Sequence, residues 1–205
     1  RIDTYGWEVK RVLPIINEEI NEEWISDKTR YACDGLKNQR LDTPYIKNGK
    51  VFKKISWQEA YKKIFEKISE TPSEKIAGIT GDLSNMETTF LIKEFFEKTI
   101  KSKNLDSRND NYYVNTNDRK NYIFNTKIEG LEQSDLILLI GTNPRYEATI
   151  LNSRIRKAYV KNKTEIYSVG NVGELTYPYK ILENNTKTIK DIVNGNHVLS
   201  EKIIK

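Results

Sequence analysis

The clearest hydrophobic pattern in the chain lies between Ser134 and Val160. Leu136–Ile140 is a run of apolar residues that is too short for a buried helix and is typical of a parallel strand covered on both faces. Glycine and proline then interrupt the chain at Gly141–Pro144. Beyond this break, apolar residues return at helical spacing, at Ala148, Leu151, Ile155 and Ala158. We therefore predict a strand, a turn and an amphipathic helix, with the turn at the carboxyl edge of a sheet, where ligands tend to bind.

The same alternation of strand and helix covers the chain after residue 75. Strands are predicted at Ile76–Thr80 and Glu165–Val169, and helices at Thr186–Val193 and after Ser84, which forms a capping-box pattern with Glu87. A further short helix is predicted near 127–131. Repeated alternation of this kind predicts an α/β fold with a doubly wound, mostly parallel sheet over residues 71–205.

A polar, tyrosine-rich stretch from Lys101 to Asn125 has no clear period. We predict a long connection there, with one strand around Tyr112–Val114. Tyrosines interleaved with lysine and arginine are able to stack on nucleic-acid bases. More often, such tyrosines cover the edge of a core or an interface, and this is the interpretation that we favour.

The first 70 residues have a different character, antiparallel and rich in loops, and we predict that they form a small separate lobe. The predicted elements are a half-buried strand within Trp7–Leu13, a short helix capped by Ser26 or Asp27, a hairpin turning at Asn48-Gly49, and a helix from Trp57 to about Ser69 that begins with a capping box of Ser56 and Glu59.

The composition limits the chemistry that the chain is able to perform by itself. Among its 205 residues, Cys33 is the single cysteine and His197 the single histidine. This excludes a disulfide within the chain and a self-contained zinc or iron–sulfur site built from cysteine and histidine. A magnesium or calcium ion held by carboxylates is not excluded, although no EF-hand spacing is visible. The chain begins with Arg1 rather than methionine, so we expect it to be a fragment or a processed piece.

The chain carries 34 Lys and Arg against 29 Asp and Glu, a net charge of +5. This excess allows a nucleic-acid partner. The basic residues are spread among the acidic ones, however, and this favours a solvated surface, so we predict no nucleic-acid partner. No apolar run approaches the ~20 residues that span a bilayer, and we predict no direct insertion into a membrane.

Glycines follow both predicted strands of the central region, at Gly81 and Gly141. Neither precedes a glycine-rich fingerprint or a lysine-serine phosphate cradle, so each is interpreted as closing a turn. Cys33 has only the distant His197 as a histidine base, and a lone cysteine is more often a small buried hydrophobe than a nucleophile.

Three carboxylates, Glu87, Asp135 and Glu147, are candidates for the carboxyl edge of the sheet. Acidic residues near helix starts are also expected from the helix dipole alone. The residues therefore predict an α/β fold with no catalytic, cofactor-binding or metal-binding residue of its own, and a scaffold or interaction module as the default.

Two stretches resemble one known family. Asn21–Tyr31, followed by Asp34–Leu36 and Gln39–Leu41, closely resembles the large iron–sulfur subunits of respiratory complex I, the NADH–quinone oxidoreductases. A second stretch, Gly141–Ala148 with Leu151-Asn152, Arg154–Ala158 and Leu175–Tyr177, resembles the same subunits. The order and separation of the two stretches fit as well, so the resemblance covers essentially the whole chain.

The resemblance implies a piece of the region that is built like a molybdopterin oxidoreductase. Residues 1–70 would be the remnant of its small 4Fe-4S Mo/W bis-MGD-type domain, and 71–205 its first α/β domain, incomplete at the C-terminal end. The family's ferredoxin-like segment, which carries the working clusters, is absent. The position of Ser26 is, in some bacterial relatives, the last cysteine ligand of an additional four-iron cluster, and a serine hydroxyl is a far poorer ligand. Cys33 matches no ligand position, so neither a cluster nor molybdopterin is expected.

The function implied by the resemblance is structural. The full subunit passes electrons from NADH through FMN and iron–sulfur clusters to quinone, coupled to proton translocation. The chain would pack against other subunits of the hydrophilic arm, including the NADH/FMN-binding subunit, on the cytoplasmic face of the bacterial inner membrane or the matrix face of the mitochondrial one. The alternative is a divergent α/β domain that binds a nucleotide or other small ligand at the carboxyl edge near Gly141–Arg145.

Overall fold

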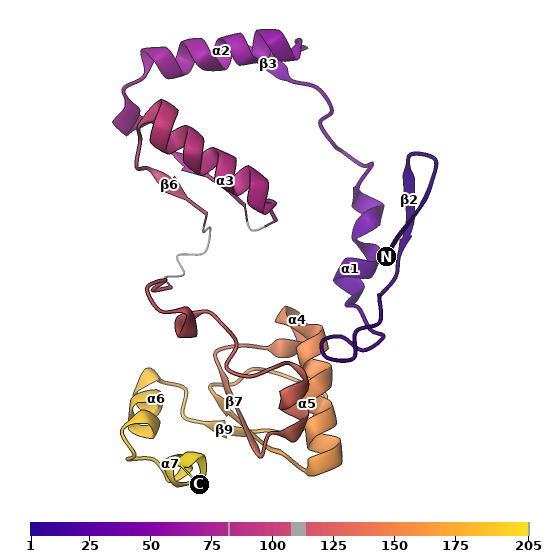
Figure 1. Cartoon of the computed structure of the whole chain (residues 1–205), viewed down its shortest axis with the longest axis vertical. Coiled ribbons are helices and arrows are strands. Elements are labelled where there is room, and N and C mark those ends of the chain that lie inside the picture. The colour runs from indigo at the N-terminus through magenta and orange to yellow at the C-terminus, as the bar shows by residue number, and fades with distance from the viewer. Residues whose placement is uncertain (82, 108–113, 205) are drawn as a thin grey trace. The chain divides into compact units, whose positions relative to one another are not determined.

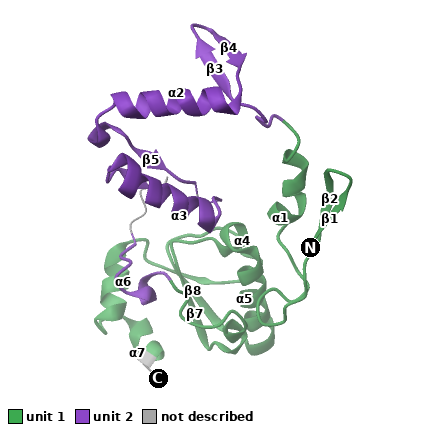
Figure 2. Cartoon of the chain, turned by 45° about the horizontal axis from the view of Figure 1, so that its top comes forward, with its two compact units in different colours: residues 1–38, 123–205 green, residues 39–122 purple. Residues whose placement is uncertain are grey.

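The computed structural model describes residues 1–81, 83–107 and 114–204. It contains two compact units: unit 1 comprises residues 1–38 and 123–205, and unit 2 comprises residues 39–122 (Figure 2). The strands are β1 (Ile2–Tyr5), β2 (Glu8–Val12), β3 (Tyr45–Asn48), β4 (Val51–Lys54), β5 (Gly78–Ile79), β6 (Leu105–Asp106), β7 (Leu136–Ile140), β8 (Glu165–Val169) and β9 (Lys180–Leu182). The α-helices are α1 (Asp27–Tyr31), α2 (Trp57–Glu70), α3 (Met86–Glu94), α4 (Pro144–Glu147), α5 (Thr149–Asn162), α6 (Thr186–Val193) and α7 (Val198–Ile204) (Figure 1).

The core of unit 1 is a parallel sheet in the order β7-β8-β9. Alternate residues of β7 enter two different apolar clusters because successive side chains of a strand point to opposite faces. Ile137 and Leu139 pack with Ile155 and Ala158 of α5. Leu136 and Leu138 pack against the cluster formed by Tyr167, Ile192 and Leu199, of which the last two belong to α6 and α7. Helices therefore cover both faces of this sheet, as predicted for a run that is apolar throughout.

The predicted elements of this region are confirmed. The strands β7 and β8 and the helix α6 have the predicted bounds. The helix after the break is also present, with Ile155 and Ala158 nearly inaccessible at 2% and 0% exposure. A separate turn of helix, α4, occupies Pro144–Glu147 because Asn143 caps it and proline is at its first position.

The N-terminal part of unit 1 consists of the antiparallel hairpin β1-β2 and the short helix α1. Ser26 is the N-cap of α1, because its side chain accepts a hydrogen bond from the Thr29 amide. This confirms one of the two predicted caps. The strand predicted within Trp7–Leu13 is β2.

Unit 2 contains the hairpin β3-β4, the helices α2 and α3 and the parallel pair β5-β6. The hairpin turn at Asn48-Gly49 is confirmed, with Gly49 in the left-handed region at φ +62°. The helix α2 starts as predicted, with Ser56 accepting a hydrogen bond from the Glu59 amide. The helix α3 continues into a π-helical turn at Phe95–Ile100.

Some predictions of local structure are wrong. The cap of α3 is Asn85 and not Ser84, because the Asn85 side chain accepts the hydrogen bond from the Thr88 amide. The short helix predicted near 127–131 is confirmed in a shifted position, as a 3-10 helix at Glu129–Gln133. The strand predicted at Ile76–Thr80 is reduced to the short β5, whose partner β6 lies in the stretch for which no period was visible. The strand predicted around Tyr112–Val114 falls largely outside the described residues.

The chain is of mixed α/β content with small sheets, which confirms the α/β fold class at that level. The described residues form separate sheets in the orders β1-β2, β3-β4, β5-β6 and β7-β8-β9, so the predicted doubly wound sheet is not confirmed and stays a prediction. Within the described ranges, no helix has both the length and the apolar character needed to cross a bilayer.

Candidate functional site

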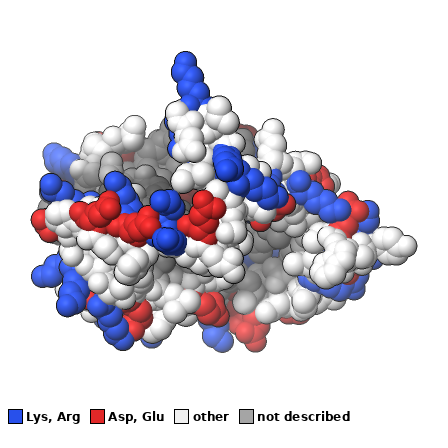
Figure 3. Space-filling model, turned by 90° about the horizontal axis from the view of Figure 1, so that it is seen from above, with Lys and Arg blue, Asp and Glu red and all other residues white. Residues whose placement is uncertain are grey.

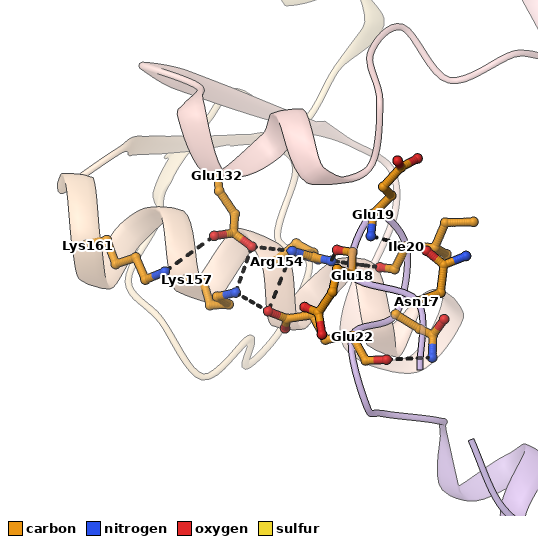
Figure 4. A network of polar contacts seen from close by, with 10 residues as sticks. Asn17, Glu18, Glu19, Ile20, Glu22, Glu132, Arg154, Lys157 and Lys161 are labelled. Carbon is orange, nitrogen blue, oxygen red and sulfur yellow. Dashed lines mark hydrogen bonds and ion pairs between the residues drawn. The ribbon is translucent and has the colours of Figure 1, made fainter. Parts of the chain in front are cut away.

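Among the described residues of unit 1, the most deeply buried charge lies where residues 17–24 meet helix α5 (Figure 4). The Arg154 side chain is only 5% exposed, and its Nη1 atom lies 2.5 Å from the Glu132 carboxylate. Its Nη2 atom donates to the backbone carbonyl of Glu18, and Nε and Nη2 both donate to that of Ile20. One guanidinium group on α5 therefore binds both a carboxylate and the main chain of the N-terminal segment.

The segment that Arg154 binds is a tight loop held by its own hydrogen bonds. The Asn17 amide donates to the Glu22 carbonyl at 2.9 Å, and the Glu22 amide donates to the Asn17 carbonyl at 2.7 Å. The Asn21 side-chain amide donates to the carbonyls of Ile15 and Trp24. Glu22 closes the loop in the left-handed region at φ +51°. The loop thus presents its carbonyl groups to α5 in a fixed geometry.

A second cation completes the cluster, which we call the α5 joint and define as the side chains of Glu22, Glu132, Arg154 and Lys157. Lys157 forms ion pairs with Glu22 and, at 2.8 Å, with Glu132. Lys161 lies 3.5 Å from Glu132 at the edge of the joint. The three cations are three or four residues apart and therefore share one face of α5.

The charges of the α5 joint favour its ionised form. Burial opposes ionisation of Glu132, but hydrogen bonds from Lys157 and Arg154 outweigh it and lower the pKa of Glu132 to about 2. Hydrogen bonds to Glu132 and Glu22 raise the pKa of Lys157 in turn. Such groups do not exchange protons near neutral pH. The α5 joint is therefore suited to fixing the N-terminal segment on α5 and not to acid–base chemistry.

The loop after β7, at the carboxyl edge of the sheet, has polar side chains that are engaged within the loop and with residues 172–174. Thr142 donates to the Glu147 carboxylate at 2.6 Å, and the Asn143 amide donates to it at 3.2 Å. These hydrogen bonds lower the pKa of Glu147. The Asn143 side chain also donates to the Val172 carbonyl at 2.5 Å, and Arg145 forms an ion pair with Glu174. The groups that would receive a ligand at this edge are thus engaged with one another.

A groove of about 690 Å³ lies beside this loop. It is lined by Ile20, Asn21, Ser26, Lys28, Phe124, Ile128, Tyr146, Glu147, Ala148, Thr149, Ile150 and Leu151. The two charged residues among these are both engaged: Lys28 donates to the Tyr146 carbonyl at 3.1 Å, and Glu147 accepts from Thr142. An apolar groove without a converging set of donors is a poor site for a nucleotide phosphate. The nucleotide alternative at Gly141–Arg145 is therefore not favoured.

The remaining candidate residues are not brought together into a site. The thiol of Cys33 is half-buried, 3.8 Å from the Arg30 carbonyl, whereas Nδ1 of His197 accepts a hydrogen bond from the Leu199 amide. Glu87 lies in the first turn of α3. Asp135 precedes β7, and its carbonyl accepts from the Glu165 amide. It therefore lies at the amino edge of the sheet, and its predicted place at the carboxyl edge is wrong.

Comparison with known proteins identifies the family. A family model described as molybdopterin oxidoreductase matches residues 40–205. The chain belongs to the molybdopterin oxidoreductase family. A second model, described as NADH-ubiquinone oxidoreductase NDSU1/NuoG-like, 4Fe-4S domain, matches residues 1–34. The α5 joint therefore ties the segment matched by the second model to a helix of the molybdopterin oxidoreductase region.

Among individual proteins, this molybdopterin oxidoreductase family member is similar to subunits of one enzyme. It is 42% identical, over its full length, to the NADH-ubiquinone oxidoreductase 75 kDa subunit of Reclinomonas americana. It is 46% identical over 96% of its length to an NADH-quinone oxidoreductase subunit of Rickettsia prowazekii, and 44% identical over 95% to the mitochondrial NADH-ubiquinone oxidoreductase 78 kDa subunit of Candida albicans. The chain spans about a third of the length of these relatives, namely 32%, 29% and 28%.

The residues that match the 4Fe-4S domain do not fit a cluster by themselves. A four-iron cluster is generally held by four cysteine thiolates, and residues 1–34 contain only Cys33 and no histidine. The hydroxyl of Ser26 caps α1. Throughout the part of the chain that the structure describes, no group of three or more His, Cys, Asp or Glu residues is placed to hold a metal ion.

The sequence prediction missed the α5 joint. The signals in the sequence were the basic residues Arg154, Lys157 and Lys161 at helical spacing and the paired glutamates within Asn17–Trp24. Neither signal identifies its partner, because the two lie more than a hundred residues apart. Nothing in a single sequence indicates that one guanidinium group binds two main-chain carbonyls.

Proposed function

We propose that this chain is a structural part of the large iron–sulfur subunit of respiratory complex I. The observation that carries the proposal is the identity of 42–46% to subunits of NADH-quinone and NADH-ubiquinone oxidoreductases over nearly the whole chain. In this role it would contribute to a complex that passes electrons from NADH through FMN and iron–sulfur clusters to quinone. Its partners would be other subunits of the hydrophilic arm, including the NADH/FMN-binding subunit, on the cytoplasmic or matrix face of the membrane.

We further propose that the chain holds no redox centre and braces those held elsewhere in the subunit. The support is the lone thiol of Cys33 and the α5 joint, which fixes the segment matching the 4Fe-4S domain. In this role the buried ionic contact would hold the segment in place without taking part in the chemistry.

Metal analysis tests the absence of a cluster. The purified chain would be incubated anaerobically with iron and sulfide, desalted, and analysed for iron by mass spectrometry and for absorbance near 400 nm. We expect a colourless protein with far less than one iron per chain. About four irons per chain, lost on the substitution Cys33→Ser, would contradict the proposal.

Replacement in a relative tests the structural role. In the Candida albicans 78 kDa subunit, this chain would replace the stretch of 201 aligned residues. We expect the chimeric complex to assemble and to oxidise NADH, and we expect the same chimera with Arg154→Met to yield less complex. A chimera that is stable but never enters the complex would contradict the proposed function.

The doubly wound sheet is also a proposal. Both parallel groups, β5-β6 and β7-β8-β9, are of the kind that such a sheet contains, and parallel strands are rarely left uncovered, whereas Ile79 of β5 is 70% exposed. We propose that these strands belong to one doubly wound sheet. Slow hydrogen exchange at β7 amides that do not donate to β8 would support further pairing, and fast exchange would contradict it.

A further inference from the structure

The hairpin β3-β4 is an exposed element of unit 2 (Figure 2). Every residue of β4 is exposed, including Val51 and Phe52 at 68% and 65%, and Tyr45 on β3 is 46% exposed. The two strands pair only with each other among the described residues. A two-stranded hairpin is at best marginally stable in water unless something covers one of its faces.

The register of the hairpin sorts its side chains into two faces. Directly opposed residues of an antiparallel pair lie on the same face. The pairs Tyr45↔Lys54 and Lys47↔Phe52 therefore share one face, which we call the Tyr45 face and define by these four residues. The other face carries the pairs Ile46↔Lys53 and Asn48↔Val51.

The hairpin is a concentrated source of positive charge. It contains Lys47, Lys50, Lys53 and Lys54, and residues 43–58 include no Asp or Glu. Among the described residues, none of these four ammonium groups forms an ion pair, and Lys47 instead lies 5.8 Å from the centre of the Phe52 ring. Lysines elsewhere in unit 2 do find carboxylates, such as Lys63 with Glu66. On the face of the molecule drawn in Figure 3, in contrast to the hairpin sequence, Lys and Arg are intermixed with Asp and Glu.

We propose that the Tyr45 face is a docking surface for an acidic protein surface, in which carboxylates surround a small apolar patch. The proposal rests on the proposed function, so the partner is another polypeptide of the complex. Two aromatic rings would supply the apolar contact, and Lys47 and Lys54 would pair with carboxylates around it. At protein interfaces, buried aromatic side chains provide affinity and complementary charges provide orientation.

The distribution of the lysines favours a protein over an anionic lipid surface. Binding to anionic lipids is associated with clusters of about four to eight basic residues on one side. Here only Lys47 and Lys54 belong to the Tyr45 face, whereas Lys53 belongs to the opposite face and Lys50 to the turn. A face with two lysines and two aromatic rings fits a few carboxylates at fixed positions on a protein better than it fits the uniform charge of a lipid surface.

The test uses two matched double variants of the same hairpin. Lys47→Glu with Lys54→Glu reverses the charges of the Tyr45 face, and Lys50→Glu with Lys53→Glu makes the same change in net charge elsewhere. Both would be introduced into the chimeric Candida albicans subunit. We expect the first pair to reduce the yield of assembled complex at least tenfold and the second to have little effect. Equal yields would overturn the proposal.

A second readout identifies the partner directly. Treatment of the assembled chimeric complex with a carbodiimide joins lysines to carboxylates in contact, and mass spectrometry locates the links. We expect Lys47 and Lys54 to be linked to Asp or Glu of a different polypeptide. Links only within the same subunit, or none, would overturn the proposal, as would co-sedimentation of the purified chain with phosphatidylglycerol vesicles that the first double variant abolishes.

The outcomes of these experiments separate the proposed function from the docking surface. A chimera that fails to assemble without any hairpin substitution contradicts the proposed function and the docking surface together. A chimera that assembles while its hairpin lysines are unlinked, or while both double variants assemble alike, contradicts the docking surface alone. Circular dichroism of the purified variants controls for misfolding, which we do not expect because all four lysines are exposed.

Discussion

At the scale of single residues, Arg154 determines how the N-terminal segment is held. Its planar guanidinium group carries five N–H donors, enough to bind the Glu132 carboxylate and two backbone carbonyls at once. A lysine ammonium group has three donors around one point and is not able to span these acceptors. Arginine at this position is therefore a consequence of geometry as well as charge.

Replacing Arg154 by methionine is expected to be strongly destabilising. The substitution keeps the apolar stem but leaves the carbonyls of Glu18 and Ile20 without their donor and removes one of the cations that pair with Glu132, at a cost of about 3 kcal/mol in the free energy of unfolding. Urea denaturation followed by circular dichroism measures this loss. Arg156→Met is the matched control, because Arg156 lies on the same helix but is exposed, and it is expected to cost less than about 1 kcal/mol. Equal costs would contradict the assigned role.

The stability of unit 1 is expected to depend on pH through Glu132. Its pKa falls from 4.5 to about 2 on folding, so the unfolded chain binds the proton more tightly. The contribution of Glu132 is thus complete above about pH 4.5 and is lost as the pH falls toward 2. It corresponds to about 3 kcal/mol, measurable as the free energy of unfolding at pH 6 and pH 3.

The substitution Glu132→Gln isolates this effect. The variant has no charge to titrate, so it should be less stable than the parent chain at pH 6 and should lose less stability between pH 6 and pH 3. Glu129→Gln provides the control, since Glu129 lies on the same 3-10 helix and, among the described residues, forms an ion pair only with Lys127, at 3.7 Å. A parent chain and a Glu132→Gln variant with parallel pH profiles would show that Glu132 does not carry the dependence.

At the scale of elements, two neighbouring residues compete as the N-cap of α3. The Ser84–Glu87 capping box and Asn85 both qualify as caps, and the structure uses Asn85. Asn85→Ala is expected to lower the free energy of unfolding by about 1 kcal/mol, whereas Ser84→Ala should change it by a few tenths. Thermal unfolding of the two variants measures both changes in the free energy of unfolding. A larger loss for Ser84→Ala than for Asn85→Ala would show that Ser84 is the cap after all.

An element was predictable where the hydrophobic pattern of its own residues indicates which of its faces are buried. The run Leu136–Ile140 is apolar on both faces, and both faces are covered by helices of the same unit. The strand β6 was not predictable, because Leu105-Asp106 offers two residues without alternation. Its pairing with Gly78-Ile79 depends on a contact distant in sequence.

At the scale of the whole molecule, the sequence indicated the α/β class, and the resemblance of two short stretches indicated the family that the comparisons confirm. The sequence alone did not indicate which distant segments of the chain contact each other. The contact between residues 17–24 and α5 joins segments 134 to 136 positions apart through hydrogen bonds from Arg154. The position of the candidate site at the carboxyl edge was predictable from the sequence. The hydrogen bonds within it were not, since only the structure reveals that Thr142 and Asn143 donate to the Glu147 carboxylate.

The way Arg154 binds residues 17–24 sets limits on how this segment is able to change. Because the guanidinium group contacts carbonyl oxygens of Glu18 and Ile20, which every amino acid possesses, the side chains at these two positions are free to vary. Insertion or deletion of a single residue between Asn17 and Glu22 would instead move both oxygens away from their donor. We therefore expect homologues to differ freely in the identity of these residues while preserving their number.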